Sequence, residues 1–177
     1  MEIIFAGFGG QGVLTSGLIT AEMALSAGKN VTWMPAYGPS MRGGKAYSVV
    51  KFSDGVIGGP DYDTPDVVVA MNGPSLEFAD CLKDGGLLIV NTDAVDTVPD
   101  YNGRIDVVEV ACTTLAESVK NIKAANIVSI GAIIKARQIF DIEDAKVALK
   151  DYFVSHGKGK FAEANEAALM AGFECVK

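Results

Sequence analysis

The chain has 177 residues, which suits one domain with a substantial hydrophobic core. Its formal net charge of −7 argues against nucleic acid as a main partner, because binding a phosphate backbone needs clustered lysine and arginine. No apolar run approaches the roughly 18 residues of a membrane helix, and the first residues lack the basic segment of a secretory signal. We therefore expect a cytoplasmic protein that makes no use of a membrane.

The composition is unusually apolar and offers little catalytic chemistry. Hydrophobic residues make up 49% of the chain, which fits either burial against partner subunits or a parallel sheet covered on both faces. Cys81, Cys112 and Cys175 are far apart and form no C-x-x-C pair, so we expect reduced thiols and neither an iron–sulfur cluster nor a structural zinc in this chain. The single histidine, His156, completes no Ser-His-Asp arrangement, and no catalytic residue is assigned.

A glycine turn follows the first predicted strand, an apolar run at residues 3–6. Gly7, Gly9 and Gly12 have the G-x-G-x-x-G spacing, in which glycines permit a tight turn, close approach of a ligand and close packing of helix on strand. The following helix would direct its free N–H groups toward an anion. Its predicted apolar stripe, closed by Gly28, is Leu14, Leu18, Ala21 and Leu25.

Three interpretations of this turn stay open: a dinucleotide site, a turn that only packs helix on sheet, and an anion or partner site without a nucleotide cofactor. A dinucleotide site usually has an acidic residue at the end of the second strand, about 20 residues beyond the glycines. Residues 30–35 read NVTWMP and contain no carboxylate, which counts against NAD or FAD.

The second strand, at residues 30–34, leads into an unusual loop at residues 35–44. Its two prolines and three glycines exclude a helix or a central strand, yet Tyr37 and Met41 give it an apolar load. Small residues follow Arg42, namely Gly43 and Gly44, so a ligand or another backbone could come close to it. We expect either a loop that contacts an anion or a partner, or a long crossover that packs its own aromatic residues.

The rest of the chain alternates between strands and helices. Strands are expected at residues 46–52, 66–71, 87–90 and 104–110, with residues 56–58 returning as the second arm of a hairpin. Helices are expected at residues 76–82, 113–120 and 126–140, then from Asp141 and from Phe161, with Asn126 and Asp141 as N-caps and Gly172 ending the last helix. This order predicts one α/β domain over residues 1–177, a three-layer sandwich whose mostly parallel central sheet has helices on both faces and whose first β-α-β unit is Rossmann-like.

Three segments carry a resemblance to a known family. AGFGGQGV at residues 6–13, YGPSMRGG at residues 37–44 and NGPSL at residues 72–76, which follows the strand at 66–71, occur in the order found in gamma subunits of 2-oxoacid:ferredoxin oxidoreductases. The resemblance covers nearly the whole chain. The form of residues 37–44 is similar to the 2-oxoglutarate and branched-chain types rather than the pyruvate type.

The resemblance implies a subunit of a coenzyme A-dependent complex that oxidatively decarboxylates a 2-oxoacid and passes two electrons to ferredoxin, or runs in reverse. It implies a heterotetramer with alpha, beta and delta subunits, in which thiamine diphosphate and the iron–sulfur clusters belong to other subunits. The substrate implied is 2-oxoglutarate, and the chain alone should be inactive.

From this resemblance we expect coenzyme A to be contacted by Gly7, Gly9, Gly10, Gln11, Gly12 and Arg42, and partner subunits by Tyr37, Met41 and Arg42. Two other hypotheses remain: a stand-alone dinucleotide- or anion-binding module, and a purely structural assembly protein.

Overall fold

A computed structural model describes residues 1–38 and 44–177. Six strands form one sheet in the order β2-β3-β1-β4-β5-β6. Their bounds are β1 (Glu2–Phe8), β2 (Asn30–Tyr37), β3 (Lys45–Ser53), β4 (Val67–Ala70), β5 (Leu87–Asn91) and β6 (Asp106–Val110). β3 runs antiparallel to both of its neighbours, while β1, β4, β5 and β6 pair in parallel. The predicted α/β class with a mostly parallel sheet is confirmed.

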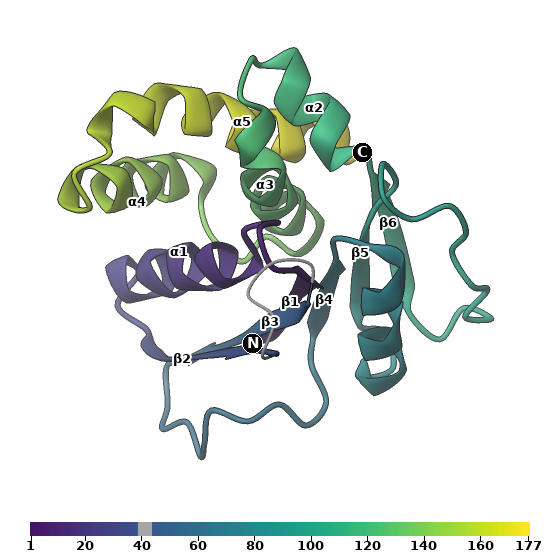
Figure 1. Ribbon diagram of the computed structural model, residues 1–177. Coiled ribbons are helices and arrows are strands. Elements are labelled where there is room, and N and C mark those ends of the chain that lie inside the picture. Colours follow the sequence, from purple (N-terminus) through teal and green to yellow (C-terminus); the bar gives the residue numbers. More distant parts are fainter. Residues whose placement is uncertain (39–43) are drawn as a thin grey trace.

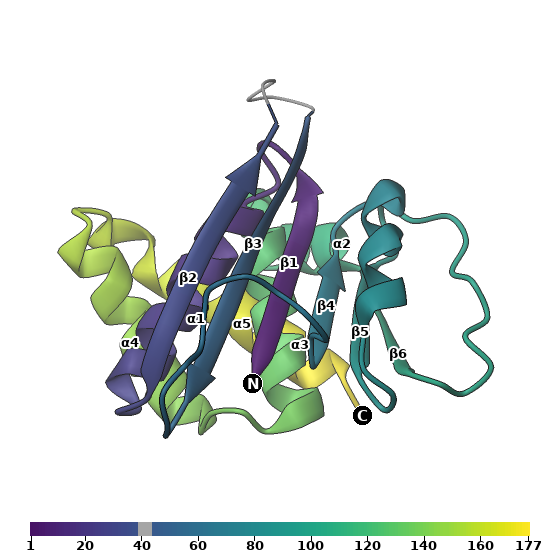
Figure 2. The same ribbon diagram turned by 90° about the horizontal axis from the view of Figure 1, so that it is seen from below.

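The helices cover the two faces of this sheet unequally (Figures 1 and 2). The α-helices are α1 (Val13–Ser26), α2 (Cys112–Ser118), α3 (Ala125–Arg137), α4 (Ile142–Ser155) and α5 (Ala162–Cys175), and the 3₁₀ helices are η1 (Gly73–Cys81), η2 (Ile122–Ala124) and η3 (Gly159–Phe161). On one face α1 and α3 touch the strands, and α2, α4 and α5 pack outside them. On the other face η1 packs on β1 and β4. One face of the sheet therefore carries a second, outer layer of helices.

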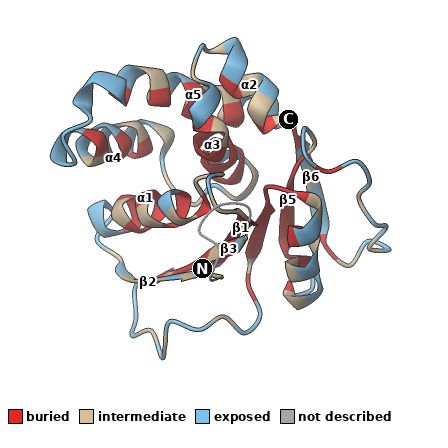
Figure 3. Cartoon of the chain, in the orientation of Figure 1, coloured by how far each residue is buried: buried red, intermediate tan, exposed pale blue. Residues whose placement is uncertain are grey.

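Alternation along β1 divides the hydrophobic core between these two faces. Ile3 and Phe5 belong to the large cluster under the α-helices, whereas Ile4 and Ala6 belong to the smaller cluster under η1. β4 and β5 are buried along their whole length, and so are residues 3–7 of β1, as Figure 3 shows, because both of their faces are covered. Among the described residues, no helix has both the length and the apolar character needed to cross a membrane.

The buried face of α1 differs from the predicted stripe. Leu25 is 53% exposed and Leu14 and Leu18 are half-buried, while the small residues Ser16, Gly17 and Ala24 face the core. Close contact between helix and sheet explains this choice, because a Cβ on Gly17 would lie 2.3 Å from the Ser48 Oγ on β3. The predicted end of the helix is confirmed: Gly28 has φ +75°, and its N–H bonds to the Leu25 carbonyl.

Several other expectations for local structure are wrong. β2 continues through Pro35, which an edge strand tolerates, and its hairpin partner is β3. Residues 56–58 form no strand, and Val56 is 98% exposed. η1 is a 3₁₀ helix rather than the expected α-helix. Asn126 lies inside the first turn of α3 instead of capping it, and Gly172 lies inside α5.

Gly172 has a packing role that explains its position. A Cβ at Gly172 would lie 1.9 Å from the Val128 carbonyl oxygen, and a Cβ at Gly131 would lie 2.0 Å from that of Leu169. The two glycines therefore let the backbones of α3 and α5 approach each other closely. A tight pair of helices thus forms the centre of the thicker helical face.

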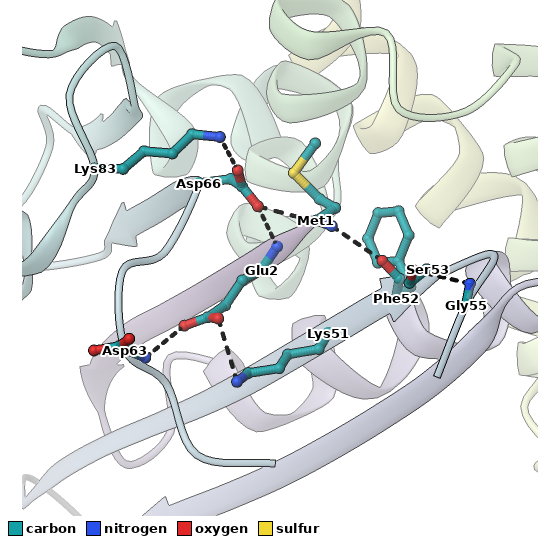
Figure 4. Close-up of polar contacts among 9 residues, drawn as sticks. All are labelled: Met1, Glu2, Lys51, Phe52, Ser53, Gly55, Asp63, Asp66 and Lys83. Carbon is teal, nitrogen blue, oxygen red and sulfur yellow. Dashed lines mark hydrogen bonds and ion pairs between the residues drawn. The ribbon is translucent and has the colours of Figure 1, made fainter. Parts of the chain in front are cut away.

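The amino end of β1 carries a cluster of paired charges, shown in Figure 4. Glu2 forms an ion pair with Lys51 at 3.3 Å, and its other carboxylate oxygen accepts the Asp63 N–H at 3.0 Å. Asp66 pairs with Lys83 and accepts the backbone N–H of Glu2 at 2.6 Å. Burial alone would raise the pKa of Asp66, but the bonds from Lys83 and the Glu2 N–H outweigh it and lower the pKa. The charges of Glu2, Lys51, Asp66 and Lys83 are therefore each held by a neighbour.

Candidate functional site

The order in which the chain adds strands to the sheet reverses between β1 and β4. From β1 it crosses through α1 to β2, on the far side of β3, whereas from β4 it crosses through η1 to β5. α1 and η1 lie on opposite faces, and a crevice lined by Phe8 and Asn72 lies at the carboxyl ends of β1 and β4. In open α/β sheets this position is the usual place for a ligand. The glycine turn lies here.

The glycine turn is shaped by three of its glycines. Gly10 and Gly12 have φ values of +104° and +76°, which other residues rarely adopt. A Cβ on Gly7 would lie 2.8 Å from the Gln11 Oε1 and 2.9 Å from a methyl group of Val13. A Cβ on Gly12 would lie 2.7 Å from the side chain of Asn126. At Gly7 and Gly12 the protein's own side chains take the space, whereas no atom of the described residues lies within 4 Å of the missing Cβ of Gly10.

Gln11 bridges the crevice with its side-chain amide. Its Oε1 accepts the N–H of Phe8 at 2.7 Å and the Nδ2–H of Asn72 at 2.9 Å, and its Nε2 donates to the Met71 carbonyl at 2.9 Å. Asn72 in turn caps η1 by accepting the N–H of Ser75. Gln11 therefore ties the end of β1 to the end of β4 without a charge.

The first turn of α1 faces a groove of about 510 Å³. The groove is lined by the glycine turn, the first helical residues and two residues of the β2–β3 hairpin, namely Phe8, Gly9, Gly10, Gly12, Val13, Leu14, Thr15, Tyr37 and Ala46. Gly12 occupies the N-cap position, where it offers no side-chain cap, and the first turn has no acidic residue. The free N–H groups and the positive end of the helix dipole therefore favour an anion in this groove.

A second groove, of about 340 Å³, lies between the β2–β3 hairpin and η1. Tyr37 is 66% exposed and contributes to both grooves. Lys45 and Glu77 line the second groove and form an ion pair of 2.8 Å across it. Tyr37 and the glycine turn, remote in sequence, thus line one surface.

The structure brings together most of the predicted site residues. Gly9, Gly10 and Gly12 line the first groove, Gly7 lines the second, and Gln11 spans the crevice below them. Tyr37 is exposed beside them. The predictions for Met41 and Arg42 lie outside the described residues.

Sequence alone did not single out the polar residues at the ends of β4 and β5. The NGPS segment predicts only a turn at Asn72, although an asparagine directly after a buried strand is a usable signal. Asn91 Oδ1 accepts the N–H of Cys112 at 3.1 Å, and Asp93 accepts the N–H groups of Thr113 and Thr114. Burial acts to raise the pKa of Asp93, but these bonds outweigh it and lower the pKa.

The fold and the site define an α/β domain with a mostly parallel sheet, in which a glycine turn precedes a helix N-terminus that has no side-chain cap. The family model described as pyruvate ferredoxin/flavodoxin oxidoreductase matches residues 2–175, and the chain belongs to that family. The resemblance expected from the three sequence segments is therefore confirmed.

Relatives and solved structures agree with this assignment. The chain is 39% identical to the ketoisovalerate oxidoreductase subunit VorA of Methanothermobacter thermautotrophicus. The match covers all of this chain and 36% of that protein. The chain is 36% identical to the 2-oxoglutarate synthase subunit KorC of Methanothermobacter marburgensis, with 99% of this chain and 96% of that one covered.

Among solved structures, the gamma subunit of the keto/oxoacid ferredoxin oxidoreductase of Geobacter sulfurreducens matches with a TM-score of 0.82 at 32% identity, covering 98% of this chain and 96% of that chain. The 2-oxoglutarate:ferredoxin oxidoreductase of Magnetococcus marinus, with 2-oxoglutarate, coenzyme A and succinyl-CoA bound, matches with a TM-score of 0.80 at 25% identity, covering all of this chain and 31% of that chain. The chain thus spans about a third of some relatives and nearly the whole of others.

Proposed function

We propose that this chain is the gamma subunit, or gamma-type domain, of a coenzyme A-dependent 2-oxoacid:ferredoxin oxidoreductase. The full-length match to KorC and to the Geobacter gamma subunit carries the proposal. In this proposed complex, the chain acts with alpha, beta and delta subunits and with ferredoxin. Thiamine diphosphate and iron–sulfur clusters reside on those partners, where they supply the decarboxylation and the electron transfer.

The proposed substrate is 2-oxoglutarate, with a branched-chain 2-oxoacid as the alternative. Relatives of similar identity are named for 2-oxoglutarate and for ketoisovalerate, and others are common subunits of pyruvate and ketoisovalerate enzymes. A shared subunit of this kind fits a chain in which we assign no catalytic residue.

The proposed role of this chain in the reaction is to hold an anionic group of coenzyme A. The groove in front of α1 supports this role, because free N–H groups and a helix dipole stabilise a phosphate without a counter-charge on the protein. Gly10 leaves the backbone of the turn open to close approach. The sequence adds Arg42 as a cation that would complete the site.

The groove also favours a second candidate, a stand-alone anion-binding module. A dinucleotide version of it is less well supported, because β3 separates β1 from β2, the strand that would bring the ribose-binding acid. Gln11 also fills the crevice in which a pyrophosphate would cross from β1 to β4.

The proposal is tested by purifying a tagged chain from its own cells under anaerobic conditions. We expect iron–sulfur and thiamine subunits to co-purify, and the complex to reduce a viologen dye only when coenzyme A and a 2-oxoacid are both present. Comparing 2-oxoglutarate with branched-chain 2-oxoacids and pyruvate then identifies the substrate. A chain that purifies without partners, and that NAD, FAD or coenzyme A stabilises in a thermal shift assay, would contradict the proposal and favour the stand-alone module.

A further inference from the structure

A separate cavity of about 340 Å³ also reaches the first turn of α1, and Tyr37 does not line it. It shares only Gly12 and Thr15 with the groove described above, and its other walls come from the α2–α3 connection and the turn between α4 and α5. The residues that line it are Gly12, Thr15, Asn121, Lys123, Asn126, Ile127, Phe153, Lys158, Phe161 and Asn165. The proposed function makes no use of these walls.

The lining of this cavity is positively charged although the chain carries a net charge of −7. Lys123 and Lys158 line it, and no aspartate or glutamate does. Neither lysine forms an ion pair with the described residues. Lys160 lies beside the lining residue Phe161, with its ammonium 5.0 Å from the centre of that ring. By contrast, the cavity between α1 and α4 is lined by three aspartates and one lysine.

Three helices begin at this cavity and add to its positive potential. α1 begins after Gly12, α5 begins after Phe161, and Asn126 and Ile127 belong to the first turn of α3. None of the three has a side-chain cap. The dipoles of the three helices therefore favour an anion in the same space as the two lysines. The 3₁₀ helices η2 and η3 lead directly into α3 and α5, so it is the first turn of α1 that adds free N–H groups.

Amide side chains supply the polar part of the cavity. Asn126 is more than nine-tenths buried, and its Nδ2 donates to the Gly12 carbonyl at 3.3 Å. Its Oδ1 accepts no hydrogen bond from the described residues, and neither does the Oδ1 of Asn121, whose Nδ2 donates to Asn165. A ligand that satisfies these oxygens must carry a hydroxyl or amino donor as well as its anion.

We propose that this cavity is a second, separate binding site, for a small phosphorylated molecule of the nucleoside phosphate class. Lys123 and Lys158 hold the phosphoryl oxygens, the amide oxygens of Asn121 and Asn126 accept from hydroxyl or amino groups, and Phe153 and Ile127 contact the apolar body. The inference goes beyond the proposed function, because it concerns different side chains from those assigned to coenzyme A.

The test measures ADP binding to the full chain by isothermal titration calorimetry, with adenosine as the uncharged probe. We expect ADP to bind and adenosine to bind at least about tenfold more weakly, since it lacks the phosphates. Lys123→Ala with Lys158→Ala should raise the Kd for ADP by about tenfold or more. The matched control is Lys150→Ala on α4, an exposed lysine outside this cavity, which should leave the Kd within about twofold.

Two further variants keep the test decisive. Lys123→Arg with Lys158→Arg should retain ADP binding, because the charges are conserved, and thermal unfolding verifies that each variant is folded. Tyr37→Ala alters the two grooves beside the β2–β3 hairpin but not the lining of this cavity, and it should leave the Kd for ADP unchanged. Absence of ADP binding, an unchanged Kd in the double alanine variant, or loss of binding in Tyr37→Ala would overturn the proposal. A polyglutamate peptide that binds more tightly than ADP, through the same lysines, would also overturn it and assign the surface to an acidic protein.

Discussion

The two ends of the central sheet carry polar groups of opposite character. At the amino end of β1, the charges of Glu2, Lys51 and Asp66 are partly buried and each is paired (Figure 4). At the carboxyl end the side chains that join the strands are the neutral amides of Gln11 and Asn72. There, the N–H groups of the first turn of α1 have no side-chain cap.

This difference distinguishes polar groups that stabilise the fold from polar groups that can bind a ligand. Paired charges satisfy one another, so the amino end contributes to stability and has little left to offer a ligand. The carboxyl end holds its strands with neutral amides and leaves a field of positive partial charges facing two cavities. Substitutions at the two ends should therefore differ in what they change.

The largest effect is expected from Gly12→Ala at the carboxyl end. Alanine would be strained at φ +76°, and its Cβ would lie 2.7 Å from Asn126, so we expect unfolding free energy to fall by roughly 2–3 kcal/mol. Urea denaturation measures the loss. Gly10→Ala is the matched control: it has the strained φ of +104° but open space around the new Cβ, so it should cost about 1 kcal/mol. Equal losses would show that the Asn126 contact is unimportant.

Gln11→Ala should have the next largest effect. It removes the acceptor of the Phe8 N–H and a donor to the Met71 carbonyl, and we expect a loss of about 1–2 kcal/mol in unfolding free energy. Amide hydrogen exchange should show that Phe8 loses its protection. Full protection of Phe8 in this variant would mean that the Gln11 bridge does not hold the turn.

At the amino end, Lys51→Met should cost about 1 kcal/mol, because it leaves the Glu2 carboxylate with 15% exposure and no cation. Adding Glu2→Gln should recover part of this loss, which a double-mutant cycle on unfolding free energy measures. Additive losses would contradict the view that these charges act as a pair. Ligand binding at the carboxyl end should not change in either variant.

The smallest effect at neutral pH, below about 1 kcal/mol, is expected from Asp66→Asn, because its ion pair with Lys83 is half exposed. The effect should depend on pH. The folded pKa of Asp66 is lowered, so its contribution is complete above the unfolded pKa of about 4 and is lost as pH falls through the folded value. Unfolding free energy measured between pH 7 and pH 3 should therefore fall less steeply in Asp66→Asn. Parallel curves would contradict this role.

The sequence predicts a structural feature well when the residues that form it are close together in the chain. The buried strands β4 and β5 and the cap at Asp141 follow from local pattern, because apolar runs and capping positions act within a few residues. The buried face of α1 does not: Gly17 faces the sheet because Ser48 approaches it from another strand. A leucine stripe alone cannot reveal this contact.

The same limit applies to the candidate site. The glycine spacing locates the turn and the open N-terminus of α1, since both are local. It cannot show that Gln11 bridges to Asn72, or that α1, α3 and α5 begin at one cavity, because these contacts join residues 44 to 114 positions apart. Topology alone brings them together.

The most direct test of the central claim compares the two ends in the assembled, anaerobically purified oxidoreductase. The KM for coenzyme A is measured for Arg42→Ala, a residue that the sequence adds to the proposed site, and for Lys51→Met at the amino end. The account predicts a KM several-fold higher in Arg42→Ala with kcat nearly unchanged, and an unchanged KM in Lys51→Met. An unchanged KM in Arg42→Ala, or an equal rise in both variants, would contradict the assignment of the carboxyl end as the coenzyme A-binding end.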